Sequence, residues 1–410
     1  MKRVCIGLTV AMLLGGGIAA QKPPLLPEKD VAALANELSG ETAKRNLEGI
    51  ARFHRQRGSQ GFHAAAELVA ERLRAYGLSD VAILQFPADG KIFYGTQRSR
   101  PAWDAEKGEI EAIEFRRRVG CGDRNVIAEC IDGPVVLHES YEAEPVVLAE
   151  DSETAKTIAT LVDVGEGTMP SDYEGKEIEG RVVLVSAQPG AVQDLAVGRF
   201  RAAGIISYAQ NQKTAWWGEN EDLIRWGHLE TFSPNKTWAF MVSPKTARAL
   251  KETLASGVSI LVNAVVKAGQ HPGNYEVVTA TIPGADAKLK DEEIAFSCHL
   301  DHQRPGANDN ASGCVTILEA ARTLQKLIKE GKLARPARTI RFIFPPEIEG
   351  TLALLNGEGR RLMLKEAQDS SAVSVITGPK MAQRIKAVVH MDMVGGGPET
   401  KAVFHVTRGR

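Results

Sequence analysis

The sequence lacks several features that would narrow its class at once. Lysine and arginine number 50 against 51 aspartate and glutamate residues, so the formal net charge is only −1. A chain so balanced has no excess of basic charge for a polyanion, and we expect no nucleic-acid partner. Aromatic residues make up only 6% of the chain, yet hydrophobic residues as a whole make up 43%, which supports a large core.

Long apolar runs are also missing, apart from one at the N-terminus. A basic start, Met1–Arg3, precedes an uncharged run from Val4 to Ala20 that ends in small residues. This order is typical of a secretory signal peptide over residues 1–20. The run is shorter than the about 20 residues that a membrane helix needs. We therefore expect a secreted or periplasmic protein with no stable membrane span after cleavage, with an uncleaved anchor as the alternative.

Cysteine is scarce, with five in 410 residues, and Cys5 lies in the expected signal peptide. Cys121 and Cys130 are close in sequence, and the sequence is compatible with a disulfide between them in an oxidising compartment or with two free thiols. Cys298 and Cys314 flank the polar motif described next. We expect both to pack as small hydrophobic residues.

What the chain does contain is a dense polar motif from Ser297 to Gly313, SCHLDHQRPGANDNASG. It follows an apolar segment, 294–296, that predicts a buried strand. Residues two apart in a strand point to the same face, so His299 and Asp301 are expected to project together. A histidine that binds a metal usually donates its other ring N–H to a carboxylate, and this role suits Asp301. Asp309, on the turn that follows, offers a carboxylate able to bridge two metal ions.

The surroundings of the motif predict a strand–loop–helix unit. Apolar residues recur on one helical face after Ser312, and Gly331 ends the pattern. Strands alternating with helices favour an α/β fold with a mostly parallel central sheet flanked by helices, in which ligand sites lie at the carboxyl ends of strands. Further elements are expected as strands at 81–84, 276–282, 339–344 and 387–392, and as a helix at 61–76.

The motif resembles the signature of the M28 family of zinc peptidases, His-x-Asp followed by Gly-Ala-x-Asp-Asn-x-Ser-Gly. A segment Arg-Gly-Ser-Gln at 57–60 also looks like the opening of M28 catalytic domains. The resemblance implies a zinc-exopeptidase-like fold and a cis peptide bond at Asp309–Asn310. The signature is matched at His299, Asp301, Gly306, Ala307, Asp309, Asn310, Ser312 and Gly313.

The resemblance also implies a general base and further ligands. In the family, two adjacent glutamates before a glycine supply the base and a ligand, but here Ile348 separates Glu347 from Glu349. Glu347 is favoured as ligand and Glu349 as candidate base, while an ungapped alignment from the preceding strand puts Glu349 on the ligand position. Asp392 matches the ligand of the family's Asp-Met-x-Gly, and His302 is a weaker candidate. In full, the expected metal residues are His299, Asp309, Glu347 and Asp392, and the expected catalytic residues are Asp301, Glu347 and Glu349.

Residues 138–267 differ in character from their flanks. They carry a Gly-Lys turn at 175–180, a strand at 181–185 and an Ala-x-Gly-Ile segment ending at Ile205, which is similar to the protease-associated (PA) domain often inserted in M28 peptidases. Trp226, in this insert, is expected to pack rather than to line a substrate cleft. The expected organisation is a signal peptide at 1–20, an N-terminal part of the peptidase domain at 21–137, a β-rich PA-like insert at 138–267 and the metal-binding part at 268–410.

The function implied by the resemblance is that of a secreted dizinc aminopeptidase, which hydrolyses N-terminal peptide bonds of peptide or protein substrates with a metal-activated water. The family's last metal histidine has no match between Asp392 and Arg410. We therefore expect a catalytic domain that is incomplete at its C-terminus and that holds one or two Zn²⁺ ions. One alternative is a catalytically defective peptidase scaffold with a binding role, which the unmatched histidine and the split glutamate pair favour. A zinc acyltransferase similar to glutaminyl cyclase is a further alternative, disfavoured by the insert.

Overall fold

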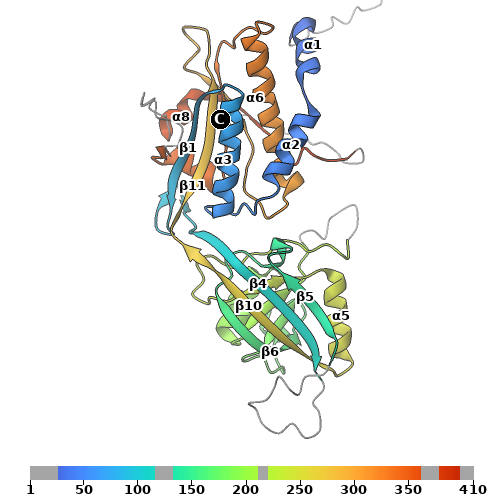
Figure 1. Ribbon diagram of the computed structural model, residues 1–410. Coiled ribbons are helices and arrows are strands. Elements are labelled where there is room, and N and C mark those ends of the chain that lie inside the picture. Colours follow the sequence, from blue (N-terminus) through green and yellow to red (C-terminus); the bar gives the residue numbers. More distant parts are fainter. Residues whose placement is uncertain (1–25, 116–132, 211–219, 362–377, 398–410) are drawn as a thin grey trace, which may run out of the picture.

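The computed structural model describes residues 26–115, 133–210, 220–361 and 378–397 (Figure 1). Within these ranges the chain forms two lobes, each built around its own sheet. The described parts of 26–101 and 272–397 are called the first lobe, and the described parts of 102–271 are called the second lobe. The expected signal peptide, Cys121 and Cys130 lie outside the described residues.

The sheet of the first lobe has six strands in the order β14-β1-β11-β13-β12-β15. Strand β12 pairs in parallel with β13 and β15, whereas the other neighbouring pairs are antiparallel. The predicted α/β fold with flanking helices is confirmed, and the parallel pairing occupies the half of the sheet that carries the motif. The strands are β1 Ser79–Ala88, β11 Gly273–Ile282, β12 Glu293–Ser297, β13 Thr339–Phe344, β14 Arg360–Arg361 and β15 Ile385–His390.

Helices cover both faces of this sheet because its strands are apolar on both sides. Along β11, Val278 and Ala280 pack with α3 and α6, whereas Tyr275 and Val277 pack with α7 and α8. Ser59 starts α3, since its hydroxyl accepts a hydrogen bond from the Phe62 N–H at 3.1 Å. The helices are α1 Glu28–Glu37, α2 Gly40–Ile50, α3 Gln60–Ala75, α6 Gly313–Lys329, α7 Glu349–Asn356 and α8 Pro379–Arg384.

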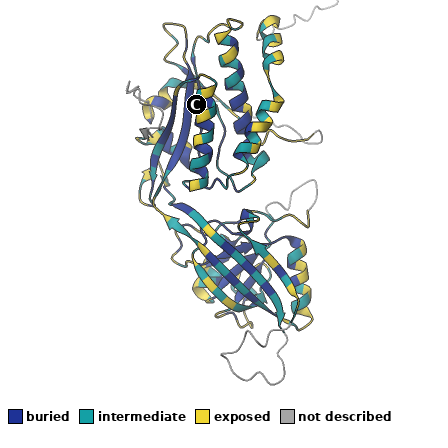
Figure 2. Cartoon of the chain, in the orientation of Figure 1, coloured by how far each residue is buried: buried dark blue, intermediate teal, exposed yellow. Residues whose placement is uncertain are grey.

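The second lobe contains a seven-stranded sheet in the order β5-β4-β10-β6-β7-β8-β9, antiparallel from β5 to β6 and parallel from β6 to β9. Along β10 buried residues alternate with more exposed ones, whereas β7, β8 and β9 are buried throughout (Figure 2). Helices α4 Pro189–Gln193 and α5 Pro244–Ala255 accompany it. The strands are β4 Ala102–Phe115, β5 Val135–Ser140, β6 Ala155–Asp163, β7 Val182–Val185, β8 Gly204–Ser207, β9 Ala239–Met241 and β10 Ser259–His271.

The second sheet begins earlier in the chain than the expected insert. Strand β4 pairs with β10 from Ala102 opposite His271 to Phe115 opposite Ser259, so it lies in the second lobe although it precedes residue 138. The antiparallel pairing of β4 with β10, and not the change in sequence character near residue 138, determines where the second sheet begins. A small ribbon, β2 Phe93–Tyr94 with β3 Gln97–Arg98, lies just before β4. The domain boundaries at 138 and 267 stay a prediction.

Two further expectations concern cysteines and membranes. Cys298 and Cys314 are buried free thiols that pack in the core of the first lobe, as predicted. Across the described ranges, no helix combines the length and the apolar character that a membrane span requires.

The two lobes meet beside the motif through buried and polar contacts. The side chain of Arg57, between α2 and α3, is 2% exposed and pairs with Glu150 and Asp151 of the second lobe. Arg304, inside the motif, donates a hydrogen bond to the backbone oxygen of Ala143 at 2.8 Å. The second lobe therefore forms one wall around the motif, and removal of one partner from the buried ion pair would leave unpaired charge.

The junction generates a prediction about pH. His54 accepts a hydrogen bond from the Arg304 N–H and contacts the Tyr141 ring edge to face. Burial, followed by nearby cationic side chains, lowers the pKa of His54 to about 3. An unfolded histidine titrates near pH 6.5, so the folded state binds fewer protons between these values and its stability falls as pH falls through that window. We expect this residue to lower the free energy of unfolding by about 1–2 kcal/mol from pH 6.5 to pH 5.

Urea unfolding of the wild type and of His54→Gln at the two pH values measures how much His54 contributes to the pH dependence of the free energy of unfolding. Glutamine keeps an acceptor for the Arg304 N–H but does not titrate. The variant is expected to lose less stability on acidification than the wild type. An equal loss in both proteins would contradict the assignment.

Candidate metal centre

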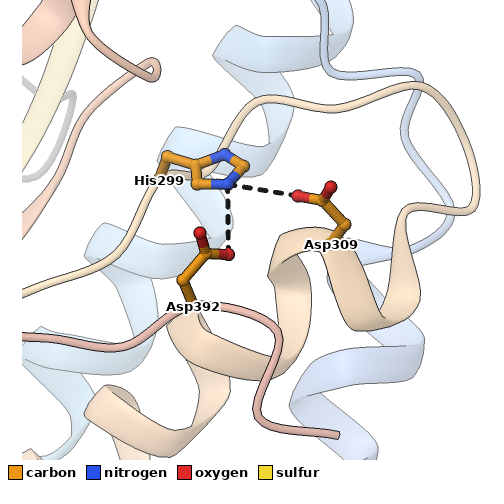
Figure 3. Close-up of side chains that lie close together, drawn as sticks. All are labelled: His299, Asp309 and Asp392. Atoms are coloured by element: carbon orange, nitrogen blue, oxygen red, sulfur yellow. Dashed lines mark ion pairs between the residues drawn. The ribbon is translucent and has the colours of Figure 1, made fainter. Parts of the chain in front are cut away.

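Three side chains from separate segments converge on one point (Figure 3). His299 follows β12, Asp309 lies in the turn Ala307–Ser312 before α6, and Asp392 follows β15. The Nε2 atom of His299 is 3.2 Å from Asp309 Oδ1 and 3.6 Å from Asp392 Oδ1. One ligand atom from each residue lies within 4.8 Å of the other two. The parallel pairing of β12 with β15 brings these strand ends together.

The spacing of these atoms fits a tetrahedral ion. Zinc binds histidine nitrogen at about 2.0–2.1 Å and carboxylate oxygen at about 2.0–2.2 Å, so neighbouring ligand atoms lie about 3.3–3.5 Å apart. The distances from His299 Nε2 to the two carboxylates bracket that range. One imidazole and two carboxylates are also a donor set that suits Zn²⁺. The three residues thus fit a zinc ion and leave room for a further ligand.

The charges of the site favour a cation among these side chains. His299 is 4% exposed, and burial by itself would lower its pKa, but the carboxylates of Asp301 and Asp309 outweigh burial and raise the pKa of His299 to about 11. Burial likewise opposes ionisation of Asp309, yet His299 and His302 hold the pKa of Asp309 well below its usual range. A positive charge among these groups is therefore stabilised, and a metal ion supplies more of it than a proton.

Asp301 lies on the other side of the His299 ring. The Nδ1 atom of His299 is 3.1 Å from the backbone oxygen of Asp301 and 3.4 Å from its carboxylate Oδ1. That carboxylate also accepts the Glu347 N–H at 2.6 Å. With Nδ1 directed at Asp301, Nε2 is left to face Asp309 and Asp392.

The loop that carries the motif is held from beneath by Arg55, which is 0% exposed. Its guanidinium donates to the backbone oxygens of Leu300 at 2.7 Å, Pro305 at 3.2 Å and Gly306 at 3.1 Å. The backbones of Arg55 and His302 also exchange two hydrogen bonds. One buried side chain therefore ties together both ends of the loop between His299 and Asp309.

The turn around Asp309 is closely packed against the end of β15. Asn310 donates to the Met391 oxygen at 2.9 Å and accepts from the Gly313 N–H at 3.0 Å. A side chain at Gly313 would place its Cβ 2.3 Å from that Met391 oxygen, so only glycine fits there. The predicted cis peptide bond at Asp309–Asn310 is present. These contacts fix Asp309 relative to Asp392.

Ser312 does not cap α6 with its side chain as a helix start usually does. Its hydroxyl donates instead to the Asn308 oxygen at 2.7 Å and accepts from the Val394 N–H at 3.0 Å. The predicted helix is confirmed as α6, while the serine binds the turn to the segment after Asp392.

Glu347 and Glu349 lie in different environments, one exposed and one buried. Strand β13 ends at Phe344, and Ile348 adopts a positive φ of 54° that turns the chain into α7. Glu349 is 6% exposed and pairs with Arg100. Glu347 is exposed at the pocket rim and is not one of the three converging residues. Although the residue as a whole is exposed, partial desolvation of its carboxyl group, opposed by His299, raises the pKa of Glu347.

A pocket over the site is lined by both lobes. Trp226, 37% exposed, lies in its wall and stacks on His228. Trp226 therefore packs against His228, as expected, and also lines the pocket. Gln303 of the motif and Arg57 of the Arg-Gly-Ser-Gln segment also line the wall. No local sequence signal marks the remaining wall residues, which are Gln56, Arg100, Glu150 and His228.

Substitution of Arg55 tests whether the loop depends on it. Arg55→Lys removes the planar fork of donors, and one ammonium group cannot reach all three carbonyl oxygens. Each buried carbonyl left unpaired costs about 1–3 kcal/mol. We expect a loss of several-fold to about 100-fold in zinc affinity, as for groups that orient metal ligands.

Zinc titration and urea unfolding of the variant measure both effects. The exposed Arg52→Lys is the matched control and is expected to change stability by no more than about 0.5 kcal/mol. Wild-type zinc affinity in Arg55→Lys would show that the loop holds its ligands without the buried guanidinium.

Sequence relatives point to one group of enzymes. Residues 277–410 match the family described as Peptidase family M28. The chain is 31% identical over 200 residues to leucine aminopeptidase 1 of Pyrenophora tritici-repentis. The aligned region covers 43% of this chain and 46% of that protein. It is 24% identical over 243 residues to the probable lipoprotein aminopeptidase LpqL of Mycobacterium tuberculosis, 58% of this chain and 43% of that protein. The chain thus spans less than half the length of these curated relatives.

Solved structures show the same fold. The zinc aminopeptidase BSAP from Bacillus subtilis superposes with a TM-score of 0.53 at 19% identity, covering 90% of this chain and 70% of that one. An aminopeptidase from Aneurinibacillus sp. strain AM-1 superposes with a TM-score of 0.50 at 20% identity, covering 88% and 72%. The α/β architecture described above is therefore that of known aminopeptidase structures.

Proposed function

We propose that this protein is a zinc-dependent aminopeptidase that removes residues from the N-terminus of peptides. The observation that carries the proposal is the convergence of His299, Asp309 and Asp392 at the ends of β12 and β15. The segment that contains all three matches an M28 peptidase family. The names of the relatives, leucine aminopeptidase among them, support the aminopeptidase type.

In this proposal His299, Asp309 and Asp392 would hold one zinc ion, and the second carboxylate oxygen of Asp309 would be free to serve another. When bound, zinc supplies Lewis acidity, which lowers the pKa of a water molecule and polarises a substrate carbonyl group. Asp301 keeps the His299 ring oriented through its contacts with Nδ1. These residues fit the ions because their facing atoms have the separations of a tetrahedral site.

Glu347 is the residue we assign to proton transfer. It takes a proton from the attacking water and returns it to the amine that leaves. Its position in the pocket lining beside His299 and Asp309 supports this role. Glu349, the earlier candidate base, is buried and engaged by Arg100, so we assign it to holding the turn into α7.

The second lobe favours a chain end over the middle of a peptide. Glu150, Trp226 and His228 close one side of the pocket above the motif. An extended peptide that ran on past the site would meet this wall. We further propose that the second lobe corresponds to a PA-like insert and that the protein is secreted, a proposal supported by the signal-peptide pattern of residues 1–20.

Glutamine variants of the two glutamates test the assignment of the base. Glu347→Gln keeps the shape of the side chain but cannot accept a proton, and we expect kcat to fall about 10²- to 10⁴-fold with zinc content unchanged. Glu349→Gln weakens the pair with Arg100 and is expected to lower stability, with kcat within about tenfold of wild type. Release of p-nitroaniline from an aminoacyl p-nitroanilide measures kcat. The assignment fails if Glu349→Gln loses as much activity as Glu347→Gln.

The competing function is a peptidase scaffold that binds without catalysis, favoured by the separation of Glu347 from Glu349. Chelation of zinc followed by its return distinguishes the two. We expect chelation to abolish hydrolysis of leucyl p-nitroanilide and added zinc to restore it. N-acetyl-leucyl p-nitroanilide, which lacks the free amine, should not be hydrolysed. A zinc-loaded, folded protein that hydrolyses neither compound would favour the binding function.

A further inference from the structure

We propose that His302 is a ligand of the second zinc ion, on the side of Asp309 opposite His299. The inference rests on the proposed function, which assigns Asp309 to bridge two ions. His302 lies in the loop between Asp301 and Asp309 and lines the same pocket.

The two carboxylate oxygens of Asp309 face two different histidines. Oδ1 is 3.2 Å from His299 Nε2, and Oδ2 is 3.5 Å from His302 Nε2. The second distance lies within the separation of about 3.3–3.5 Å between ligand atoms of a tetrahedral ion, and the first lies just below it. A carboxylate with an imidazole at each oxygen is the arrangement that a bridge between two ions about 3.5–4 Å apart requires.

The second ring nitrogen of each histidine is already engaged. His302 Nδ1 is 3.0 Å from the backbone oxygen of Gln303, and His299 Nδ1 is 3.1 Å from that of Asp301. An N–H donated to a carbonyl oxygen places the lone pair on Nε2, which is the usual state of a histidine that binds a metal. In both rings that lone pair is directed at Asp309. Without metal, a proton on Nε2 satisfies these facing atoms, and a zinc ion would take the place of that proton.

The backbone holds His302 in place for this role. His302 exchanges two backbone hydrogen bonds with Arg55, whose guanidinium binds the loop on either side. The His302 side chain is 22% exposed and lines the pocket. Ligands fixed by buried neighbours in this way lose little freedom when an ion binds.

Zinc stoichiometry of four proteins tests the inference. Wild type, His302→Ala, His302→Gln and His228→Ala are dialysed to equilibrium against buffered Zn²⁺, and zinc per folded chain is measured by mass spectrometry. His228 lines the pocket but does not face Asp309, and it serves as the matched control. We expect the number of ions per chain to fall from about two to about one in both His302 variants and to stay at two in His228→Ala.

The glutamine variant separates a ligand from a hydrogen-bonding neighbour. Its amide can donate to Asp309 Oδ2 as a protonated imidazole would, but it lacks the imidazole lone pair. Two ions in His302→Gln would overturn the inference and leave the proposed function standing. If the wild type binds one ion and His299→Ala binds none, the inference is likewise overturned and the proposed function stands. A wild type that binds no zinc would overturn both. Circular dichroism of the zinc-free variants establishes that each is folded.

Discussion

The arrangement of the motif depends on one buried cation, the guanidinium of Arg55. Its hydrogen-bond acceptors are backbone oxygens: those of Leu300, Pro305 and Gly306 in the loop and those of Ile50 and Phe53 before it. A buried cation is tolerated only when its donors are satisfied, and these carbonyls satisfy it because the loop returns to the same point twice. Gly306 permits the return, since it adopts a left-handed φ of 49° and its missing Cβ leaves room for the Arg55 side chain.

The same segment also connects the site to the second lobe. Arg55 lies two residues from Arg57, which pairs with Glu150 and Asp151, and Arg304 in the loop reaches a carbonyl of that lobe. The position of the second lobe and the shape of the loop are therefore set by one short stretch before α3. This coupling explains why the pocket wall is built from both lobes rather than from the sheet that carries the motif.

The parts of the structure that sequence reasoning predicted are those determined by local chemistry. Strand β13 begins and ends where the apolar pattern does, and the cis bond at Asp309–Asn310 follows from a signature confined to a few residues. Local chemistry could not predict that β4 belongs to the second sheet, because β4 pairs with β10, which lies more than a hundred residues away in the chain. The different environments of Glu347 and Glu349 depend on the positive φ of Ile348. A β-branched residue rarely adopts a positive φ, so this turn could not be predicted.

The central claim is that His299, Asp309 and Asp392 surround a zinc ion. Anomalous diffraction at the zinc edge from crystals of the zinc-loaded protein tests it most directly. The account predicts a peak about 2.0–2.2 Å from His299 Nε2 and from one carboxylate oxygen of each aspartate. Zinc-loaded crystals whose only peaks lie away from these three side chains would contradict it.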